Sequence, residues 1–217
     1  MSAHDWTPGH FRLFISHHNA ESVQAGALRG GLRRFHIDAF VAHATIAPTV
    51  AWQDEIEDAL LTCEGCVAIL STGFKGSDWC DQEVGVCFGR GVLVLAIDAG
   101  VSPYGFIGRY QAFNPRRYES NEALCEGIFE QFRDHERSRE ALAAALVHRF
   151  EHSDSYAAAR ANLDRVKSAP SEALTYPLLD RIERAHQNNR QVAEANYYFA
   201  HSVPEEARGF VDGLRPF

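Results

Sequence analysis

The segment from Ser77 to Gly85, SDWCDQEVG, holds the two side chains best suited to chemistry. If Ser77 caps a helix, Trp79 and Glu83 lie four residues apart and share one helical face. The indole would supply a stacking surface and partial desolvation, and the carboxylate would supply a localised negative charge. The alternative is an ordinary amphipathic helix with a packed Trp and a solvated Glu. Spacing alone favours this alternative, because isolated pairs of this kind are common.

A second group of polar side chains, FISHH, ends the first apolar run at Phe14–His18. Ser16 offers a hydroxyl, and His17 and His18 offer hydrogen-bond donors or a group that titrates near neutral pH. The alternative is that these are loop residues without a chemical role. No second pair of ligands has suitable spacing, so we expect no metal site.

A third stretch, VAHATIAPTVAW at Val41–Trp52, connects a predicted strand to a predicted helix. It carries His43 and ends at Trp52. Loops in this position commonly shape a ligand pocket or a contact surface. The alternative is a connector stiffened by Pro48.

Other common motifs are missing from the sequence or lack the right context. Cys63 and Cys66 form a CxxC, but the first closes a predicted helix and the second opens an apolar strand. Both are therefore predicted to be small buried residues and not a redox or zinc pair. No G-x-G-x-x-G follows the first strand, and no G-x-x-x-x-G-K-[ST] occurs, so the usual phosphate-binding loops are absent from the sequence.

The elements that must position these residues alternate between strands and helices through the first half of the chain. Apolar runs of strand length are Phe11–Ser16, Ile37–Ala42, Cys66–Leu70 and Gly91–Ile97. Segments with helical spacing are Glu21–Phe35, Trp52–Leu61, Ser77–Phe88 and Ser120–His135. This alternation predicts an α/β fold with a parallel sheet covered on both faces. Ligands of such sheets bind outside the carboxyl ends of the strands.

After residue 136 no strand-like run appears, and the pattern predicts helices only. These are Arg139–Phe150, Tyr156–Lys167, Glu172–Gln187 and Val192–Ala200. Pro204 and Gly213 leave the last stretch without a clear prediction. We therefore divide the chain into an N-terminal tail at 1–8, an α/β domain at 9–136 and an all-helical C-terminal extension at 137–217.

The charge distribution argues against nucleic acid and membrane as partners. The formal net charge is -8, and the first 136 residues hold 18 Asp and Glu against 10 Lys and Arg. An acidic domain is a poor match for a phosphate backbone, and no polybasic cluster suggests an anionic membrane surface. The start does not resemble a signal peptide, and five cysteines are an odd count. These features predict reduced thiols and a cytoplasmic location.

Together, the segments resemble a TIR domain of the bacterial type. The matching elements, in order over about residues 9–135, are FISHH, FVAHATIAPTVAWQDEIEDAL, VAILSTGF, SDWCDQEVG and GRGVLVLAID. The resemblance implies a flavodoxin-like fold with a five-stranded parallel sheet. It also implies an activity, because many members of this family cleave the nicotinamide–ribose bond of NAD.

The resemblance further implies roles for single residues. The catalytic Glu of the family lies in a W-x-x-x-E arrangement, which corresponds to Trp79 and Glu83 here. The loop after the second strand corresponds to the BB loop, which borders the pocket and often mediates assembly between domains. The substrate-binding candidates on this basis are Ser16, His17, His43, Trp52, Ser77 and Trp79. NAD+ would be the substrate, with no cofactor and no metal.

The chemistry of NAD+ suits a fixed carboxylate. Nicotinamide is already a cationic leaving group, so its departure needs no general acid, and positive charge develops on the ribose. The Glu83 carboxylate can stabilise that charge, as in glycoside cleavage generally. Water as the acceptor gives ADP-ribose, an intramolecular acceptor gives a cyclic isomer, and another nucleophile gives a conjugate. The sequence leaves these alternatives open.

Three functional hypotheses follow. The first is an NAD+-cleaving enzyme of bacterial antiphage defence, whose nucleotide product signals to a separate effector protein as in Thoeris-like systems. The second is a non-catalytic scaffold that self-associates through TIR domains. The third is a ligand-binding sensor in which the helical segment performs recognition. The presence of both Trp79 and Glu83 favours the enzyme.

Overall fold

The structure of this 217-residue chain is a computed structural model that describes residues 4–41, 50–198 and 201–215. Of residues 50–52 it describes the backbone only. The chain divides into two compact units, Met1–Ser138 and Arg139–Phe217. Each unit is considered separately below.

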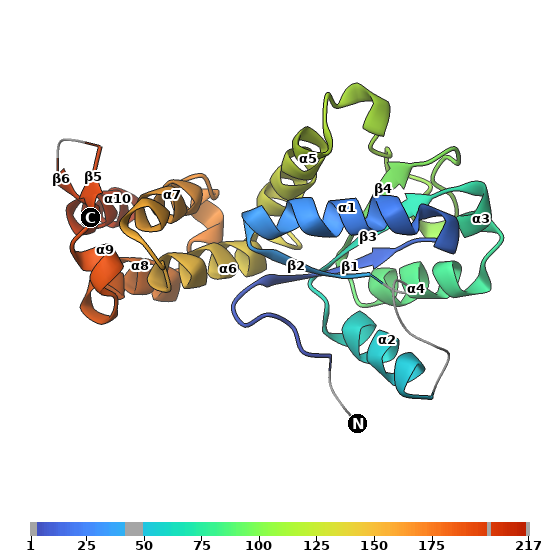
Figure 1. The fold of residues 1–217 in the computed structure, drawn as a ribbon, viewed down its shortest axis with the longest axis horizontal. Helices are drawn as coiled ribbons and strands as arrows, with labels where there is room; N and C mark the ends of the chain where they lie inside the picture. The colour runs from blue at the N-terminus through green and yellow to red at the C-terminus, as the bar shows by residue number, and fades with distance from the viewer. Residues whose placement is uncertain (1–3, 42–49, 199–200, 216–217) are drawn as a thin grey trace. The chain divides into compact units, whose positions relative to one another are not determined.

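Four parallel strands in the order β2-β1-β3-β4 form the main sheet of the first unit (Figure 1). They are β1 (Phe11–Ser16), β2 (Ile37–Val41), β3 (Gly65–Leu70) and β4 (Leu93–Asp98). All six residues of β3 are buried, as expected for a strand covered on both faces. The predicted α/β fold with a parallel sheet is confirmed.

The predicted fifth strand is wrong for the described residues, where a single bridge stands in its place. Phe113 pairs in parallel with Ile97 at the outer edge of β4. Its N–H donates to Ala96 O at 2.8 Å, and its carbonyl accepts from Asp98 N at 2.7 Å. Pro115 follows two residues later and starts a 3-10 helix. Because proline has no N–H, the ladder does not continue.

Helices cover both faces of the sheet. α1 and α5 pack together on one face, and α2 and α4 on the other (Figure 1). The bounds are α1 (Ser22–Leu32), α2 (Val50–Thr62), α3 (Thr72–Lys75), α4 (Asp78–Gly89) and α5 (Asn121–Asp134). The core between the sheet and α2 and α4 includes Phe14 stacked on Phe40, with ring centroids 5.4 Å apart. Short 3-10 helices are η1 (Asn19–Glu21), η2 (Arg33–Phe35), η3 (Gly105–Ile107) and η4 (Pro115–Arg117).

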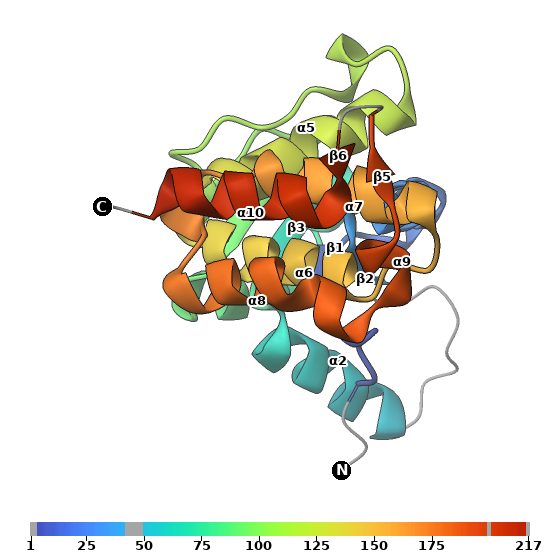
Figure 2. The same ribbon diagram turned by 90° about the vertical axis from the view of Figure 1, so that its left-hand side faces the viewer.

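Among its described residues, the second unit is helical apart from one short hairpin, so the predicted helical region is confirmed but is not all-helical. Its helices are α6 (Arg139–Glu151), α7 (Tyr156–Lys167), η5 (Ser171–Ala173), α8 (Tyr176–Asn188), α9 (Arg190–Ala193) and α10 (Val203–Leu214). α6 packs on α7 and α8, and α10 packs on the same two helices (Figure 2). α8 begins four residues later than predicted, with Pro177 in its first turn.

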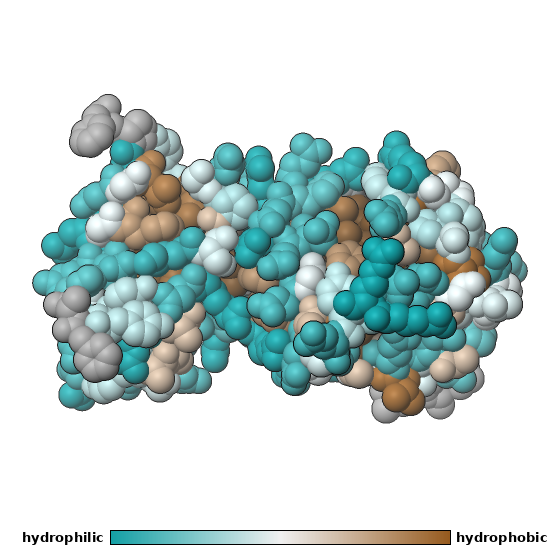
Figure 3. All heavy atoms as spheres, turned by 90° about the horizontal axis from the view of Figure 1, so that it is seen from above, coloured by the Kyte–Doolittle hydropathy of each residue, from teal (hydrophilic) through white to brown (hydrophobic). Residues whose placement is uncertain are grey.

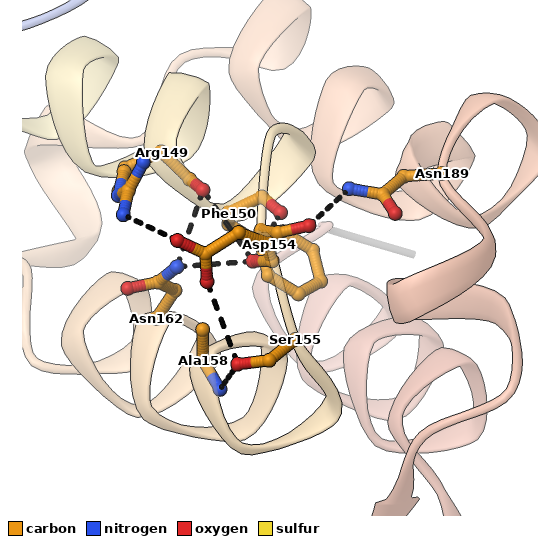
Figure 4. A network of polar contacts seen from close by, with 8 residues as sticks. Arg149, Phe150, Asp154, Ser155, Ala158, Asn162 and Asn189 are labelled. Atoms are coloured by element: carbon orange, nitrogen blue, oxygen red, sulfur yellow. Dashed lines mark hydrogen bonds and ion pairs between the residues drawn. The ribbon is translucent and has the colours of Figure 1, made fainter.

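A buried amide fixes the turn between α6 and α7 (Figure 4). Asn162 Nδ2 donates to Arg149 O at 3.2 Å and to Ser153 Oγ at 3.0 Å. Asn189 Nδ2 donates to Ser153 O at 2.9 Å from the far side of the turn. These bonds satisfy backbone groups that the end of α6 leaves without helical partners.

The predicted helix at Val192–Ala200 is wrong over residues 194–198, and residues 199–200 lie outside the described residues. α9 ends at Ala193, and a short antiparallel hairpin follows, formed by β5 (Asn196–Tyr197) and β6 (His201–Ser202). Asp164 on α7 accepts hydrogen bonds from the phenols of Tyr197 and Tyr198 at 2.6 and 2.7 Å. These long-range bonds hold the segment outside a helix.

The last stretch forms α10, which the sequence analysis did not predict. Ser202 and Glu205 form a capping box, and Pro204 occupies the first turn. A proline at this position supports the start of a helix and does not break it.

The described surface carries no element suited to crossing a membrane. None of the described helices is both long enough and apolar enough to span one. On the face shown in Figure 3, hydrophilic residues predominate and hydrophobic residues form separate small patches.

We expect Gly65→Ala to destabilise the first unit. A Cβ atom there would lie 2.5 Å from Phe132 Cε1 and 3.1 Å from Phe11 Cε1, both in the core. Such overpacking costs about 1–3 kcal/mol. Urea unfolding followed by Trp fluorescence measures it, because all three Trp residues, Trp6, Trp52 and Trp79, belong to the first unit.

The matched control is Gly30→Ala in α1, where an added Cβ meets nothing within 4 Å. This change should stabilise the helix by about 0.5–1 kcal/mol, because alanine loses less backbone entropy than glycine. Equal effects of the two substitutions would contradict the packing described for Gly65.

Candidate functional site

The candidate site lies at the carboxyl ends of β1 and β3. β1 connects to β2 on one side and pairs with β3 on the other, so the chain connections diverge between β1 and β3. Ligands of open parallel sheets bind outside such a point. Ser16 ends β1 and Ser71 directly follows β3, and both are buried.

The loops that follow these two strands pack closely against each other. The ring of His18, after β1, lies against Gly73, after β3. A Cβ atom at Gly73 would come within 2.5 Å of His18 Nδ1. Glycine is therefore needed for this close approach. Ser71 caps α3 by accepting a hydrogen bond from Phe74 N at 3.1 Å, which shapes the same edge.

α4 places Glu83 beneath this edge. Ser77 caps the helix as predicted, its Oγ accepting from Cys80 N at 3.4 Å. Ser16 follows Phe14 by two residues and so points to the sheet face on which α4 packs. The hydroxyl of Ser16 donates to Glu83 Oε2 at 2.5 Å, joining two residues that are 67 positions apart in the sequence.

The Glu83 carboxyl is buried and only half satisfied. The residue is 1% exposed, and its Oε1 has no hydrogen-bond partner. Burial raises the pKa of Glu83 from 4.5 to about 7, and the Ser16 hydroxyl partly opposes that rise. In the part of the chain that the structure describes, no basic side chain forms an ion pair with it. The group can thus hold or release a proton near neutral pH.

The other predicted site residues differ in their placement. Trp79 is 42% exposed whereas Glu83 is buried, although both belong to α4. His17 directly follows β1 and is 1% exposed, with Nδ1 3.4 Å from Ile15 O of that strand. The structure therefore joins Ser16 and Glu83 directly, with Ser77 acting through the helix cap.

Two predicted residues fall outside the description. His43 lies in the stretch 42–49, outside the described residues. Trp52 belongs to α2, but its side chain is not among those described. Their roles as substrate-binding residues stay predictions.

Cys80 belongs to the site, although the sequence analysis did not select it. The residue is 2% exposed, and both Ser16 and Glu83 influence the pKa of its thiol. Burial raises the pKa of this thiol, the Ser77 hydroxyl opposes the rise, and the Glu83 charge adds to it. The signal was available in the sequence, because Cys80 precedes Glu83 by three residues on one helical face.

The arrangement supports electrostatic chemistry on a cation. One carboxyl oxygen is fixed by Ser16, and the other is buried without a hydrogen-bond partner, so a donor or a developing positive charge that reaches it would be stabilised. Across residues 4–41, 50–198 and 201–215, no three His, Cys, Asp or Glu side chains are grouped to hold a metal ion.

Comparison with known proteins identifies the first unit. A family model described as TIR domain matches residues 13–127. Among solved structures, the TIR domain of the Toll-related receptor TRR-2 from Hydra magnipapillata is similar, with 15% sequence identity and a TM-score of 0.46. The match covers 56% of this chain and 97% of that one. No curated protein matches the chain.

We expect Glu83→Gln to stabilise the protein increasingly as pH rises. The folded carboxyl keeps its proton up to about pH 7, whereas the unfolded one loses it near 4.5. The stability associated with the Glu83 carboxyl is therefore fully present below pH 4.5 and is lost as the pH rises through about 7. With about 1.4 kcal/mol per pKa unit, the gain of the Gln variant should approach about 3 kcal/mol near pH 8.

Urea unfolding at pH 4.5 and near pH 8 measures this difference between Glu83→Gln and wild type. Glu57→Gln is the matched control, since it removes the same charge from an exposed position on α2. A stability difference that does not change with pH, or that the control reproduces, would contradict the burial of a half-satisfied carboxyl.

Proposed function

Because the chain belongs to the TIR domain family, which includes NAD-cleaving enzymes, we propose that it cleaves the nicotinamide–ribose bond of NAD+ with Glu83 as the catalytic residue. The observation that carries this proposal is the buried Glu83 carboxyl, held by Ser16 at the divergence of β1 and β3. A group in this position faces the place where ligands of such sheets bind.

Substrate binding would set the charge of Glu83. Nicotinamide in NAD+ is cationic, and a cation beside a carboxyl favours its ionised form. The pKa of about 7 in the free protein would fall, and the carboxyl proton would pass to solvent. A buried anion then lies beside the cation in a region of low dielectric, where its effect is stronger than in water.

Bond cleavage follows from that charge. The electron pair of the glycosidic C–N bond leaves with nicotinamide, which departs as a neutral base. Positive charge passes to the ribose, and the Glu83 carboxylate stabilises it there. A water molecule that adds to the ribose and loses a proton completes hydrolysis to ADP-ribose. An intramolecular nucleophile would instead give a cyclic product.

The remaining predicted residues would bind the substrate around this centre. Half-exposed Trp79 offers an aromatic face for stacking at the entrance. Ser77 caps the helix that carries Glu83, and His17 directly follows Ser16. His43 and Trp52 complete the set as predictions from the BB-loop resemblance.

The biological setting that the sequence resemblance implies is bacterial antiphage defence with a nucleotide signal for a separate effector. TIR domains commonly self-associate, so assembly of this domain would regulate the activity. Mass spectrometry of nucleotides from phage-infected cells that express wild type or Glu83→Gln tests this setting, because a signalling product should appear only with wild type.

We expect purified wild-type protein to release nicotinamide from NAD+ and Glu83→Gln to lose that activity. Removal of one group that stabilises transition-state charge typically lowers turnover by about 10²–10³-fold. Chromatography of nicotinamide, with and without a crowding agent that promotes assembly, measures the rates. Glu57→Gln should match wild type.

Equal release by wild type and Glu83→Gln would contradict the catalytic role of the carboxyl. Absence of release from wild type in both the dispersed and the crowded state would contradict the enzyme and favour a scaffold that acts through self-association.

We expect Ser16→Ala to shift the pH dependence of the reaction. In wild type, kcat/KM should rise with pH through a midpoint near the Glu83 pKa of about 7, because only the anion stabilises the ribosyl cation. The Ser16 hydroxyl lowers that pKa, so its removal should move the midpoint to higher pH.

Ser120→Ala is the control, since Ser120 caps α5 and a serine hydroxyl is lost there too. A midpoint that stays in place in Ser16→Ala, or that moves equally in both variants, would show that Ser16 does not position the catalytic carboxyl.

A further inference from the structure

A second polar cavity lies at the carboxyl end of β4. Its volume is about 490 Å³. Its walls come from α1, from the loop that follows β4 and from the segment after the Phe113 bridge. The residues that define it are Gln24, Asp98, Gly100, Ser102, Asn114 and Arg116. Neither the sequence motifs nor the proposed reaction uses this cavity.

Several polar groups on the cavity wall are available to a ligand. The side chains of Gln24, Ser102 and Arg116 form no hydrogen bond or ion pair among the described residues. Asp98 uses Oδ1 to accept from Gly100 N at 2.9 Å, and Asn114 uses Oδ1 to accept from Arg116 N at 3.0 Å. The second oxygen of Asp98 and the amide nitrogen of Asn114 remain open.

This set of groups matches a ribose phosphate. A carboxylate accepts hydrogen bonds from the vicinal hydroxyls of a ribose, as in dinucleotide-binding sheets. An unpaired guanidinium suits a phosphate group, with which it can form two parallel hydrogen bonds. No aromatic side chain is among the wall residues that the structure describes, so the cavity offers no platform for stacking a base.

The cavity lies on the same edge of the sheet as Glu83. β1 and β4 are separated by β3, so their ends are about 10 Å apart at two strand spacings. The loop after β4 folds back onto this edge, with Ala99 N and Val101 N both donating to Leu70 O. A dinucleotide has two riboses joined by a pyrophosphate, and a ligand of that form extends along the edge from one site to the other.

We propose that this cavity binds the adenosine-side ribose phosphate of NAD+, with Asp98 on the ribose hydroxyls and Arg116 on the phosphate. The proposal rests on the function proposed above. It assigns substrate recognition to residues that lie outside the W-x-x-x-E segment.

Binding of ADP-ribose tests the cavity without turnover. Isothermal calorimetry on the full chain should show that Arg116→Ala and Asp98→Asn each raise Kd at least tenfold. Asn in place of Asp98 keeps the oxygen that accepts from Gly100 N, so the loop should stay intact. Arg117→Ala is the matched control, because Arg117 is an exposed neighbour outside the cavity and its loss changes the net charge equally. Equal Kd values for all four proteins would overturn the proposal.

Kinetics with a truncated substrate separate this proposal from the catalytic one. Nicotinamide mononucleotide has the reacting ribose but lacks the adenosine half. Arg116→Ala should lower kcat/KM for NAD+ at least tenfold and leave kcat/KM for the mononucleotide unchanged. An equal loss for both substrates would overturn the assignment. If wild type cleaves neither substrate, the proposed function fails, and ADP-ribose binding alone then decides the cavity.

Discussion

The hydrogen bond from Ser16 to Glu83 constrains much of the first unit. Burying a carboxyl is unfavourable unless a hydrogen bond compensates for the lost water, and here a single hydroxyl performs that task at 2.5 Å. The two atoms meet only if β1 ends at Ser16 and α4 begins at its Ser77 cap. The close approach of His18 to Gly73 keeps the two neighbouring loops in place. The end of β1, the Ser77 cap of α4 and the packing of the two loops thus together determine the position of the Glu83 carboxyl.

The order of the strands places the contact between Ser16 and Glu83 at a candidate ligand-binding position. Because the connections from β1 and β3 diverge, no crossover connection covers the end of β1, where the buried Ser16 lies. The apolar core beneath it, which includes Phe14, Cys80 and Val84, removes water from one side of the carboxyl and raises its pKa. The same packing that stabilises the fold therefore sets the protonation of Glu83.

Much of this arrangement could be predicted from the sequence, and the failures have identifiable causes. Periodicity and the Ser77 cap gave the strands and α4 because those signals are local. The burial of Glu83 beside an exposed Trp79 depends on how α4 is rotated against the sheet, which spacing four residues apart does not determine. The hairpin at Tyr197 involves a hydrogen bond from the tyrosine hydroxyl to Asp164 on α7, which is distant in the sequence. α10 has no clear prediction from the sequence because of Pro204 and Gly213, although both residues of its capping box are present in the sequence and proline suits the first turn of a helix.

The burial of Glu83 also bears on the choice between enzyme and scaffold. A scaffold acts through exposed side chains, and the first unit has candidates such as Phe106, which is 71% exposed. Glu83 is hidden from any such contact, and its unpartnered Oε1 destabilises the fold wherever the group is ionised. An apolar residue of similar size would fill that place on α4 without this penalty. Under the proposed function, a cationic substrate that pairs with this buried, half-satisfied carboxyl gives it a physical rationale, and a scaffold provides no such partner.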